Sequence, residues 1–183
     1  IRPGDVITNE RGYRILNDRV FSGKAVDNRA GCTAAIEVMK NLKDVAHDAD
    51  VYCCGSVLEE MGVKGAGPAA ESIKPDIAIC FDVCFGATGK EMDGNNRRNY
   101  LGEGPAIMLY DWNNTSCLGN IVPTELSDAL ISTANEKEIP YQIGVTLNCG
   151  TDAALISLSG TGVKTAGIGI PNRYMHSAIG TVD

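Results

Sequence analysis

The sequence predicts one layered α/β domain with a largely buried, mostly parallel β-sheet. A chain of 183 residues has the usual length of a single domain. Its hydrophobic content of 44% excludes a disordered chain and supplies a real core. Apolar runs of strand length alternate with segments whose apolar residues recur at helical spacing. Such alternation is typical of a sheet covered by helices.

The first part of the chain predicts short strands and then a helix. Residues 6–8 and 13–16 read as extended pieces after a turn at residues 3–5. From Ala30 onward, apolar residues lie on one helical face, and Asp27 and Asn28 just before it are capping types. Residues 50–58 form an apolar run suited to a buried strand.

The rest of the chain repeats this alternation. We expect short helices at residues 69–73 and 153–158, and a longer helix that begins near residues 123–124. Residues 86–104 are polar and glycine-rich, which indicates a surface loop. The remaining apolar runs predict strands at residues 77–83, 106–110, 141–147 and 163–170.

The charge balance argues against nucleic acid as a partner. Sixteen Lys and Arg residues against 23 Asp and Glu residues give a formal net charge of −7. Phosphate contacts need clustered Lys and Arg side chains. The chain has no run of about 18 apolar residues and no signal-peptide pattern at its start. We therefore expect neither a nucleic-acid partner nor a membrane span.

The cysteines predict free thiols in a reducing compartment. Their number is odd, and their spacing matches neither a zinc-binding array nor a disulfide framework. Most lie in apolar runs, so we expect buried thiols that pack as small apolar residues. This usage favours the cytoplasm. The seven are Cys32, Cys53, Cys54, Cys80, Cys84, Cys117 and Cys149.

Polar side chains gather at the carboxyl ends of the predicted strands, where open α/β sheets place their sites. Carboxylate oxygens and an imidazole nitrogen are the ligands of a divalent cation of the zinc class. The sequence therefore predicts a metal site from some of these residues: Asp27, Glu59, Glu60, Asp82 and His176.

Glu59 and Glu60 form the most informative pair. Neighbouring side chains on an extended backbone point to opposite sides. One carboxylate could bind a metal while the other acts as general base on a metal-bound water. Two solvated acids, and a purely structural His176, remain as alternatives. The glycine-rich turn at residues 62–67 matches neither phosphate-binding pattern, which disfavours a nucleotide site.

Five segments then stand in one order along the chain. They are GKAVDNRAG at residues 23–31, EEMGVKGA at 59–66, DV at 82–83, GTDA at 150–153 and IPNRYMHS at 170–177. Together they closely resemble the tetrahedral-type, or glutamyl, metallo-aminopeptidases. The resemblance implies a layered α/β/α, zinc-exopeptidase-like catalytic domain over residues 21–183, with a mixed, mostly parallel sheet. Residues 1–20 would be the tail end of an inserted β-barrel dimerisation domain.

The resemblance also implies a role for each site residue. Asp27 would bridge two divalent metal ions, zinc or cobalt, with a cis peptide to Asn28. Glu60 and His176 would complete the first metal site, and Asp82 would belong to the second. Glu59 would be the general base on the bridging water. The residues implied near the substrate are Gly150, Thr151, Asp152, Arg173 and Tyr174.

The implied reaction removes the N-terminal residue from short peptides. Members of this family typically assemble as hollow homo-oligomers, often dodecamers. A related metal amidohydrolase, such as a carboxypeptidase or a deacylase, remains an alternative, because the metal residues barely discriminate between them.

Three departures from the family pattern shape the expectation for this chain, and one of them is that much of the dimer-forming insertion is absent. The second metal site of the family also uses a histidine from an earlier segment, which has no counterpart here, and His47 is not a candidate for that role. After Ser177 the family usually continues with Pro and Glu, whereas this chain has residues 178–180, AIG. We expect the C-terminal catalytic portion of a longer peptidase, with a catalytically incomplete fragment as the alternative.

Overall fold

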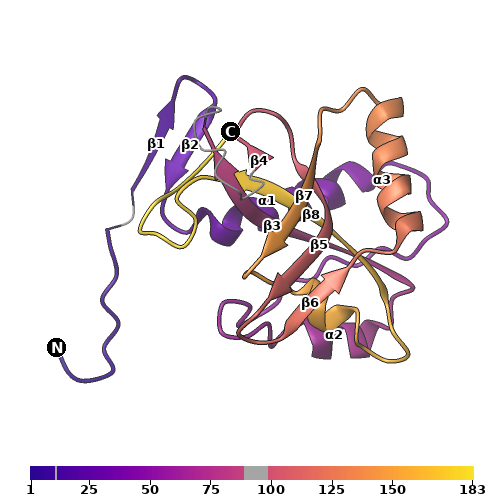
Figure 1. The fold of residues 1–183 in the computed structure, drawn as a ribbon, viewed down its shortest axis with the longest axis horizontal. Helices are drawn as coiled ribbons and strands as arrows, with labels where there is room; N and C mark the ends of the chain where they lie inside the picture. Colours follow the sequence, from indigo (N-terminus) through magenta and orange to yellow (C-terminus); the bar gives the residue numbers. More distant parts are fainter. Residues whose placement is uncertain (11, 89–98) are drawn as a thin grey trace.

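The computed structural model describes residues 1–10, 12–88 and 99–183. Its centre is a mixed β-sheet with strand order β4-β3-β8-β5-β6, and β7 pairs with β5 (Figure 1). β3 (Ile77–Ala87) runs parallel to β8 (Lys164–Asn172). β5 (Ala106–Asn113) is antiparallel to β8 and parallel to β7 (Gln142–Leu147). The predicted α/β fold is confirmed, with a sheet of mixed direction.

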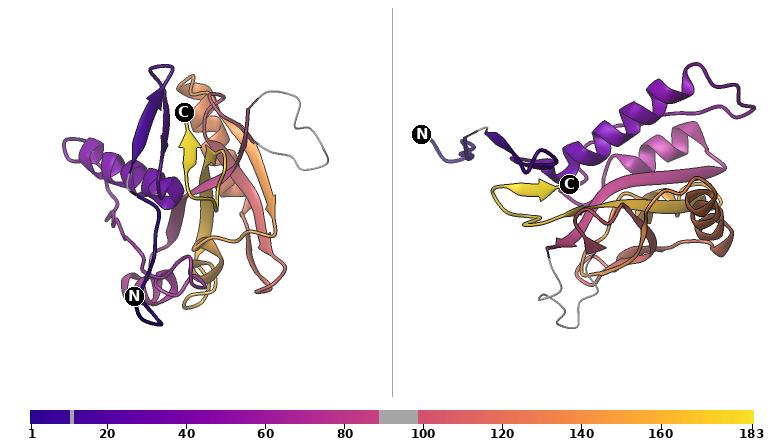
Figure 2. Two further views of the ribbon diagram at one scale, coloured as in Figure 1. Left: turned by 90° about the vertical axis from the view of Figure 1, so that its left-hand side faces the viewer. Right: turned by 90° about the horizontal axis from the view of Figure 1, so that it is seen from above.

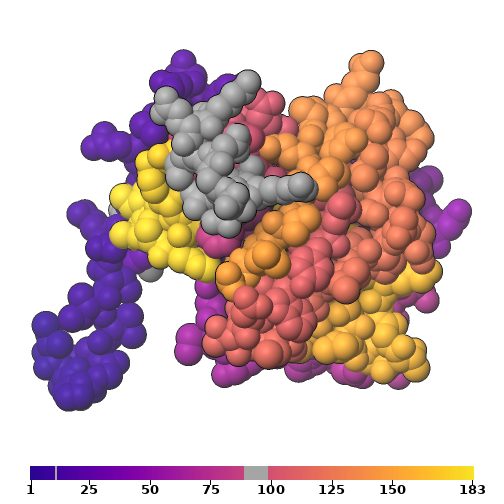
Figure 3. All heavy atoms as spheres, viewed as in Figure 1, coloured from indigo at the N-terminus to yellow at the C-terminus, as the bar shows by residue number. Residues whose placement is uncertain are grey.

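A second, three-stranded sheet joins two strands from the first part of the chain to the last strand. β2 (Val20–Gly23) pairs antiparallel with both β1 (Tyr13–Leu16) and β9 (Gly180–Val182). Residues 1–10 are exposed coil and extend away from the body (Figure 1 and Figure 3). The strand expected at residues 6–8 is therefore wrong. The domain division at residue 20 stays a prediction.

The helices cover the sheet as the periodicity predicted. α1 (Val26–Leu42) and α2 (Ala66–Ile73) lie on the same face of the central sheet (Figure 2). α3 (Thr124–Glu136) packs against β5 and β8, and α4 (Ala153–Ile156) packs against α2. Four short strands were not predicted from the sequence: β2, β9, β4 (Asn99–Tyr100) and β6 (Leu118–Ile121). Among the described residues, no helix has the length and apolar character that a membrane span requires.

The buried strand expected at residues 50–58 is wrong. Residues 51–56 have no assigned secondary structure and pair with no described strand. Tyr52 is 65% exposed and Val57 66% exposed. An apolar run becomes a strand only where a neighbouring strand satisfies its backbone groups, and no described strand lies in that position. Of the loop expected at residues 86–104, residues 89–98 lie outside the described part of the chain.

The core consists mainly of small side chains, with Cys84, Ala106 and Met108 at its centre. The cysteines correct one expectation, because four of the seven are exposed. Two of those four lie in the unpaired segment at residues 51–58, which explains their exposure. The exposed thiols are Cys32, Cys53, Cys54 and Cys117.

Candidate metal centre

Asp27 stands at the first turn of α1, in a backbone that is not yet helical. The peptide bond between Asp27 and Asn28 is cis, as the family resemblance implied. The Asn28 side chain fixes this turn from both sides: its Nδ2 donates to the Phe81 carbonyl at 2.8 Å, and its Oδ1 accepts from the Gly31 N–H at 2.9 Å. Asn28 therefore caps the helix and ties it to β3. Asp27 is held at the carboxyl end of the sheet as a result.

Gly31 explains why the helix can approach β3 so closely. A Cβ at this position would lie 2.3 Å from Asn28 Oδ1 and 2.6 Å from the Phe81 carbonyl oxygen. Both distances are far below van der Waals contact, so a larger residue would push the start of the helix away from the strand. The glycine in GKAVDNRAG is thus part of how Asp27 is positioned.

Glu59 and Glu60 lie in a tight turn that begins at Leu58. The carbonyl of Glu59 accepts from the N–H groups of Gly62 at 3.0 Å and Val63 at 2.8 Å. Glu59 is half-buried, whereas Glu60 is exposed. The two carboxylates therefore differ in exposure, but they do so in a turn and not on the extended backbone that the sequence reasoning assumed.

His176 follows β8 in a connection with unusual backbone geometry. Its φ is +60°, in the left-handed region. Its Nε2 lies 3.4 Å from Asp27 Oδ2, and the edge of its ring faces Phe85, with ring centroids 6.5 Å apart. Residues near both ends of the chain therefore meet at this point.

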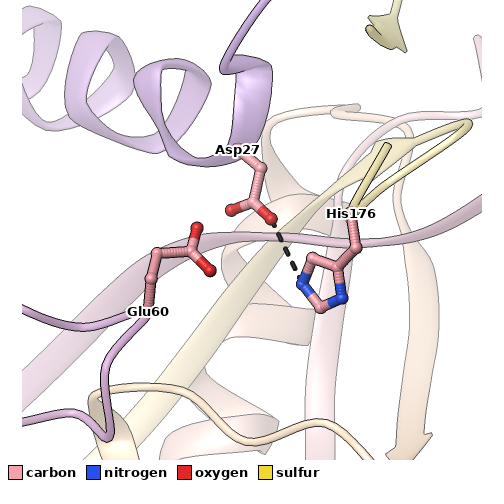
Figure 4. A group of neighbouring side chains, drawn as sticks. All are labelled: Asp27, Glu60 and His176. Atoms are coloured by element: carbon pink, nitrogen blue, oxygen red, sulfur yellow. Dashed lines mark ion pairs between the residues drawn. The ribbon is translucent and has the colours of Figure 1, made fainter. Parts of the chain in front are cut away.

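The structure brings Asp27, Glu60 and His176 together. Each offers one ligand atom, and these atoms all lie within 4.8 Å of one another. Figure 4 shows the three side chains pointing toward a common centre. Two carboxylate oxygens and one imidazole nitrogen are a donor set of the zinc class. The residues present therefore fit a divalent cation.

Asp82 lies beside this cluster rather than in it. Burial, together with the charges of Glu59, Asp27 and Asp152, raises its pKa to about 8, against a hydrogen bond from the Val83 N–H. Burial also raises the pKa of Glu59 to about 7, with added repulsion from Asp152, Glu60 and Asp27. Such crowding of carboxylates is what a divalent cation would relieve.

The residues predicted to contact substrate fall into two groups. Tyr174 lines the same pocket as Asp27, Glu60 and His176. The guanidinium of Arg173 lies over the Tyr174 ring, 4.7 Å from its centroid. Tyr174 therefore lies at the centre, and Arg173 lies against it.

The other group is Gly150 to Asp152, of which Thr151 lines a separate small cavity together with Asp82. Thr151 Oγ1 donates to Asp111 Oδ2 at 3.0 Å, and Ser56 Oγ donates to Asp152 Oδ2. The sequence reasoning missed Ser56 and Asp111. An acid inside the apolar run of β5 was the available signal for Asp111.

His47 lies outside the centre. It is exposed, and its Nδ1 is 2.8 Å from the carbonyl oxygen of Ala49. This position agrees with the expectation that His47 is not a metal ligand.

Fold and donor set together define an α/β domain with a candidate metal centre at the strand ends. The whole chain, residues 1–183, matches the M42 glutamyl aminopeptidase family. The chain therefore belongs to the M42 glutamyl aminopeptidase family.

Individual relatives agree with this assignment. A putative aminopeptidase of Acetivibrio thermocellus is 36% identical over 170 residues, which cover 93% of this chain and 48% of that protein. The structure of an aminopeptidase from the archaeon Desulfurococcus kamchatkensis superposes with a TM-score of 0.87 at 36% identity, over 95% of this chain and 47% of that one. A TET1 structure with a dodecamer in the asymmetric unit gives a TM-score of 0.77 at 31% identity, over 94% of this chain and 48% of that one. The TET1 peptidase of Pyrococcus horikoshii, which can assemble into a tetrahedron or a large octahedral shell, gives a TM-score of 0.76 at 31% identity over the same shares. The chain spans about half the length of the curated relatives it matches.

Proposed function

We propose that this chain carries the catalytic centre of a metal-dependent aminopeptidase that removes the first residue of short peptides. The observation that carries the proposal is the convergence of Asp27, Glu60 and His176 in a chain of the M42 family. A lysyl aminopeptidase of Pyrococcus furiosus and a glutamyl aminopeptidase of Lactococcus lactis, 32% and 31% identical, are among the relatives.

In this proposal Asp27, Glu60 and His176 hold one zinc or cobalt ion, and Asp27 with Asp82 holds a second. When bound, such ions polarise the scissile carbonyl and lower the pKa of the attacking water. Glu59 accepts the proton of that water and passes it to the leaving amine. Its half-buried position beside the donor cluster supports this role.

Arg173, Tyr174 and Gly150 are proposed to contact the peptide at the edge of the centre. The pocket shared by Tyr174 and the three donors supports this placement for Tyr174. A homo-oligomer is proposed from the dodecameric TET1 relative. A cytoplasmic location is proposed from the seven free thiols.

Peptide hydrolysis by the zinc- or cobalt-loaded chain tests the proposal. We expect turnover of peptides with a free first amine and none of their N-acetylated forms, whereas a deacylase would prefer the blocked forms. In Glu59→Gln, turnover should fall at least about a hundredfold with the metal content unchanged, because the amide cannot accept the proton. Glu103→Gln, an exposed acid, is the matched control. Full activity in Glu59→Gln would contradict the role of Glu59.

A further inference from the structure

The segment that leads to Glu59 has few connections to the rest of the molecule. Residues 51–58 pair with no described strand, and both Val57 and Leu58 are more than half exposed. Among the hydrogen bonds of the described residues, the one that links this segment to a distant part of the chain runs from Ser56 Oγ to Asp152 Oδ2. Ser56 stands three residues before Glu59, so this contact fixes the approach to the proposed base.

Asp152 is itself anchored from the opposite side. Its neighbour Thr151 donates to Asp111 Oδ2 at 3.0 Å, and Asp111 Oδ1 accepts from the Asn120 N–H at 2.7 Å. Asp111 is buried in β5 at 5% exposure, and Asn120 belongs to β6. A continuous series of contacts therefore runs from the sheet through Thr151 and Asp152 to Ser56.

The carboxylate of Asp152 is poorly placed to bind a substrate. Its Oδ2 is occupied by Ser56, and its Oδ1 is buried without a hydrogen-bond partner among the described residues. A buried carboxylate oxygen without a partner lowers the free energy of unfolding, so a gain in global stability does not account for this residue. Asp152 also lies near enough to Glu59 for its charge to act on it.

We propose that Ser56 and Asp152 are positioning residues, which hold the segment before Glu59 so that its carboxylate faces the metal centre. Thr151 and Asp111 fix Asp152 for this task. The inference rests on the proposed function, in which Glu59 is the general base. It gives Asp152 a role different from the substrate contact that the family resemblance implied.

Amide hydrogen exchange tests the anchor without relying on activity. In the metal-loaded chain, we expect Ser56→Ala and Asp152→Ala to speed exchange at residues 57–64 about tenfold, as loss of one such hydrogen bond implies. Ser56→Thr and Asp152→Asn keep a donor and an acceptor and should exchange like the wild type. Ser72→Ala, whose hydroxyl bonds within its own helix, is the control. Unchanged exchange in both alanine variants would overturn the proposal.

Kinetics then separates positioning from substrate contact. Ser56→Ala and Asp152→Ala should lower kcat about tenfold with little change in KM, for peptides with different first residues alike, and with the metal content retained. Asp152→Asn should keep most of kcat. A marked rise of KM in Asp152→Asn would show a charge contact with the substrate and overturn the proposal, as would faster exchange with unchanged kcat. A wild type without peptidase activity would overturn the proposed function instead, and the exchange result would then decide the anchor alone.

Discussion

Single residues in this protein do several tasks at once, and Asn28 is the clearest case. Its side-chain oxygen accepts a hydrogen bond from the Gly31 N–H of α1, and its side-chain nitrogen donates one to the Phe81 carbonyl of β3. The carboxylate of Asp27 gains its position from this neighbour. Gly31 completes the arrangement, because the space that a Cβ would need is filled by Asn28 and Phe81.

Burial separates the cysteine thiols into two groups that should differ in reactivity. Burial raises the pKa of Cys84 to about 11 and that of Cys149 to about 12, and it raises the pKa of Cys80 as well. The thiolate is the reactive form, so these three should react with iodoacetamide at pH 8 at least about a hundredfold more slowly than exposed thiols. The exposed group is Cys32, Cys53, Cys54 and Cys117.

Peptide mass spectrometry at timed intervals checks this order of reaction. In urea all seven thiols should react at similar rates, which serves as the control. Labelling of Cys84 as fast as Cys32 in the native protein would contradict its burial.

The sequence predicted more at the residue scale for the donors than for their supports. Asp27, Glu60 and His176 carry recognisable chemistry, and the structure brings them together. Ser56 and Asp111 were missed, because their importance comes from partners that lie 96 and 40 residues away in sequence, respectively. Such pairing follows from the fold and leaves no local signal.

The sequence predicted some secondary-structure elements better than others, according to whether their stability depends on their own pattern or on a neighbouring strand. The helices and most central strands were predicted, since periodicity and apolar runs reflect burial against the sheet. Residues 50–58 were not, because strand formation depends on a neighbouring edge that the local sequence does not contain. β6 and β9 are short, and their pairing depends on β5 and β2.

Two glycine-to-alanine variants compare the packing of α1, which carries Asp27, with that of α2, which carries no proposed site residue. Gly31→Ala should lower the free energy of unfolding by about 1–3 kcal/mol, because the new methyl collides with Asn28 and the Phe81 carbonyl. Gly67→Ala in α2 should be neutral or raise it by up to about 1 kcal/mol, since its nearest neighbour would be Leu155 Cβ at 3.6 Å.

Urea unfolding of both variants checks the contrast. Both replace glycine by the better helix former, so helix propensity alone predicts a gain at each position. A stabilised Gly31→Ala variant would show that α1 does not approach β3 as closely as the structure indicates.

At the scale of the whole molecule, the centre concentrates negative charge that the fold alone does not neutralise. Burial raises the pKa values of Asp27, Asp82, Asp111 and Asp152, and like charges add to the first two. The chain also has a net charge of −7. The composition indicated that the net charge is negative. The crowding of carboxylates at the centre depends on tertiary structure and was not predictable in detail.

This crowding makes the stability of the metal-free protein depend on pH. The pKa of Asp82 is higher in the folded state, about 8, than its ordinary value of 3.8. The folded state therefore binds the proton more tightly, and the free energy of unfolding should fall as pH rises from about 4 to about 8. The slope from this one carboxyl is at most about 1.4 kcal/mol per pH unit.

Urea unfolding at pH 5 and pH 8 in the presence of a chelator measures this slope. Asp82→Asn should flatten it, while Asp128→Asn, an exposed residue of α3, should leave it unchanged. Equal slopes in the wild type and Asp82→Asn would contradict the buried environment of Asp82.

The central claim is that Asp27, Glu60 and His176 hold a divalent metal ion. Elemental mass spectrometry of the purified chain, after incubation with zinc and dialysis, tests it most directly. We predict at least one tightly held zinc ion per chain, and its loss in His176→Ala but not in His47→Ala. A wild type that retains neither zinc nor cobalt, or a His176→Ala variant that retains as much metal as the wild type, would contradict the claim.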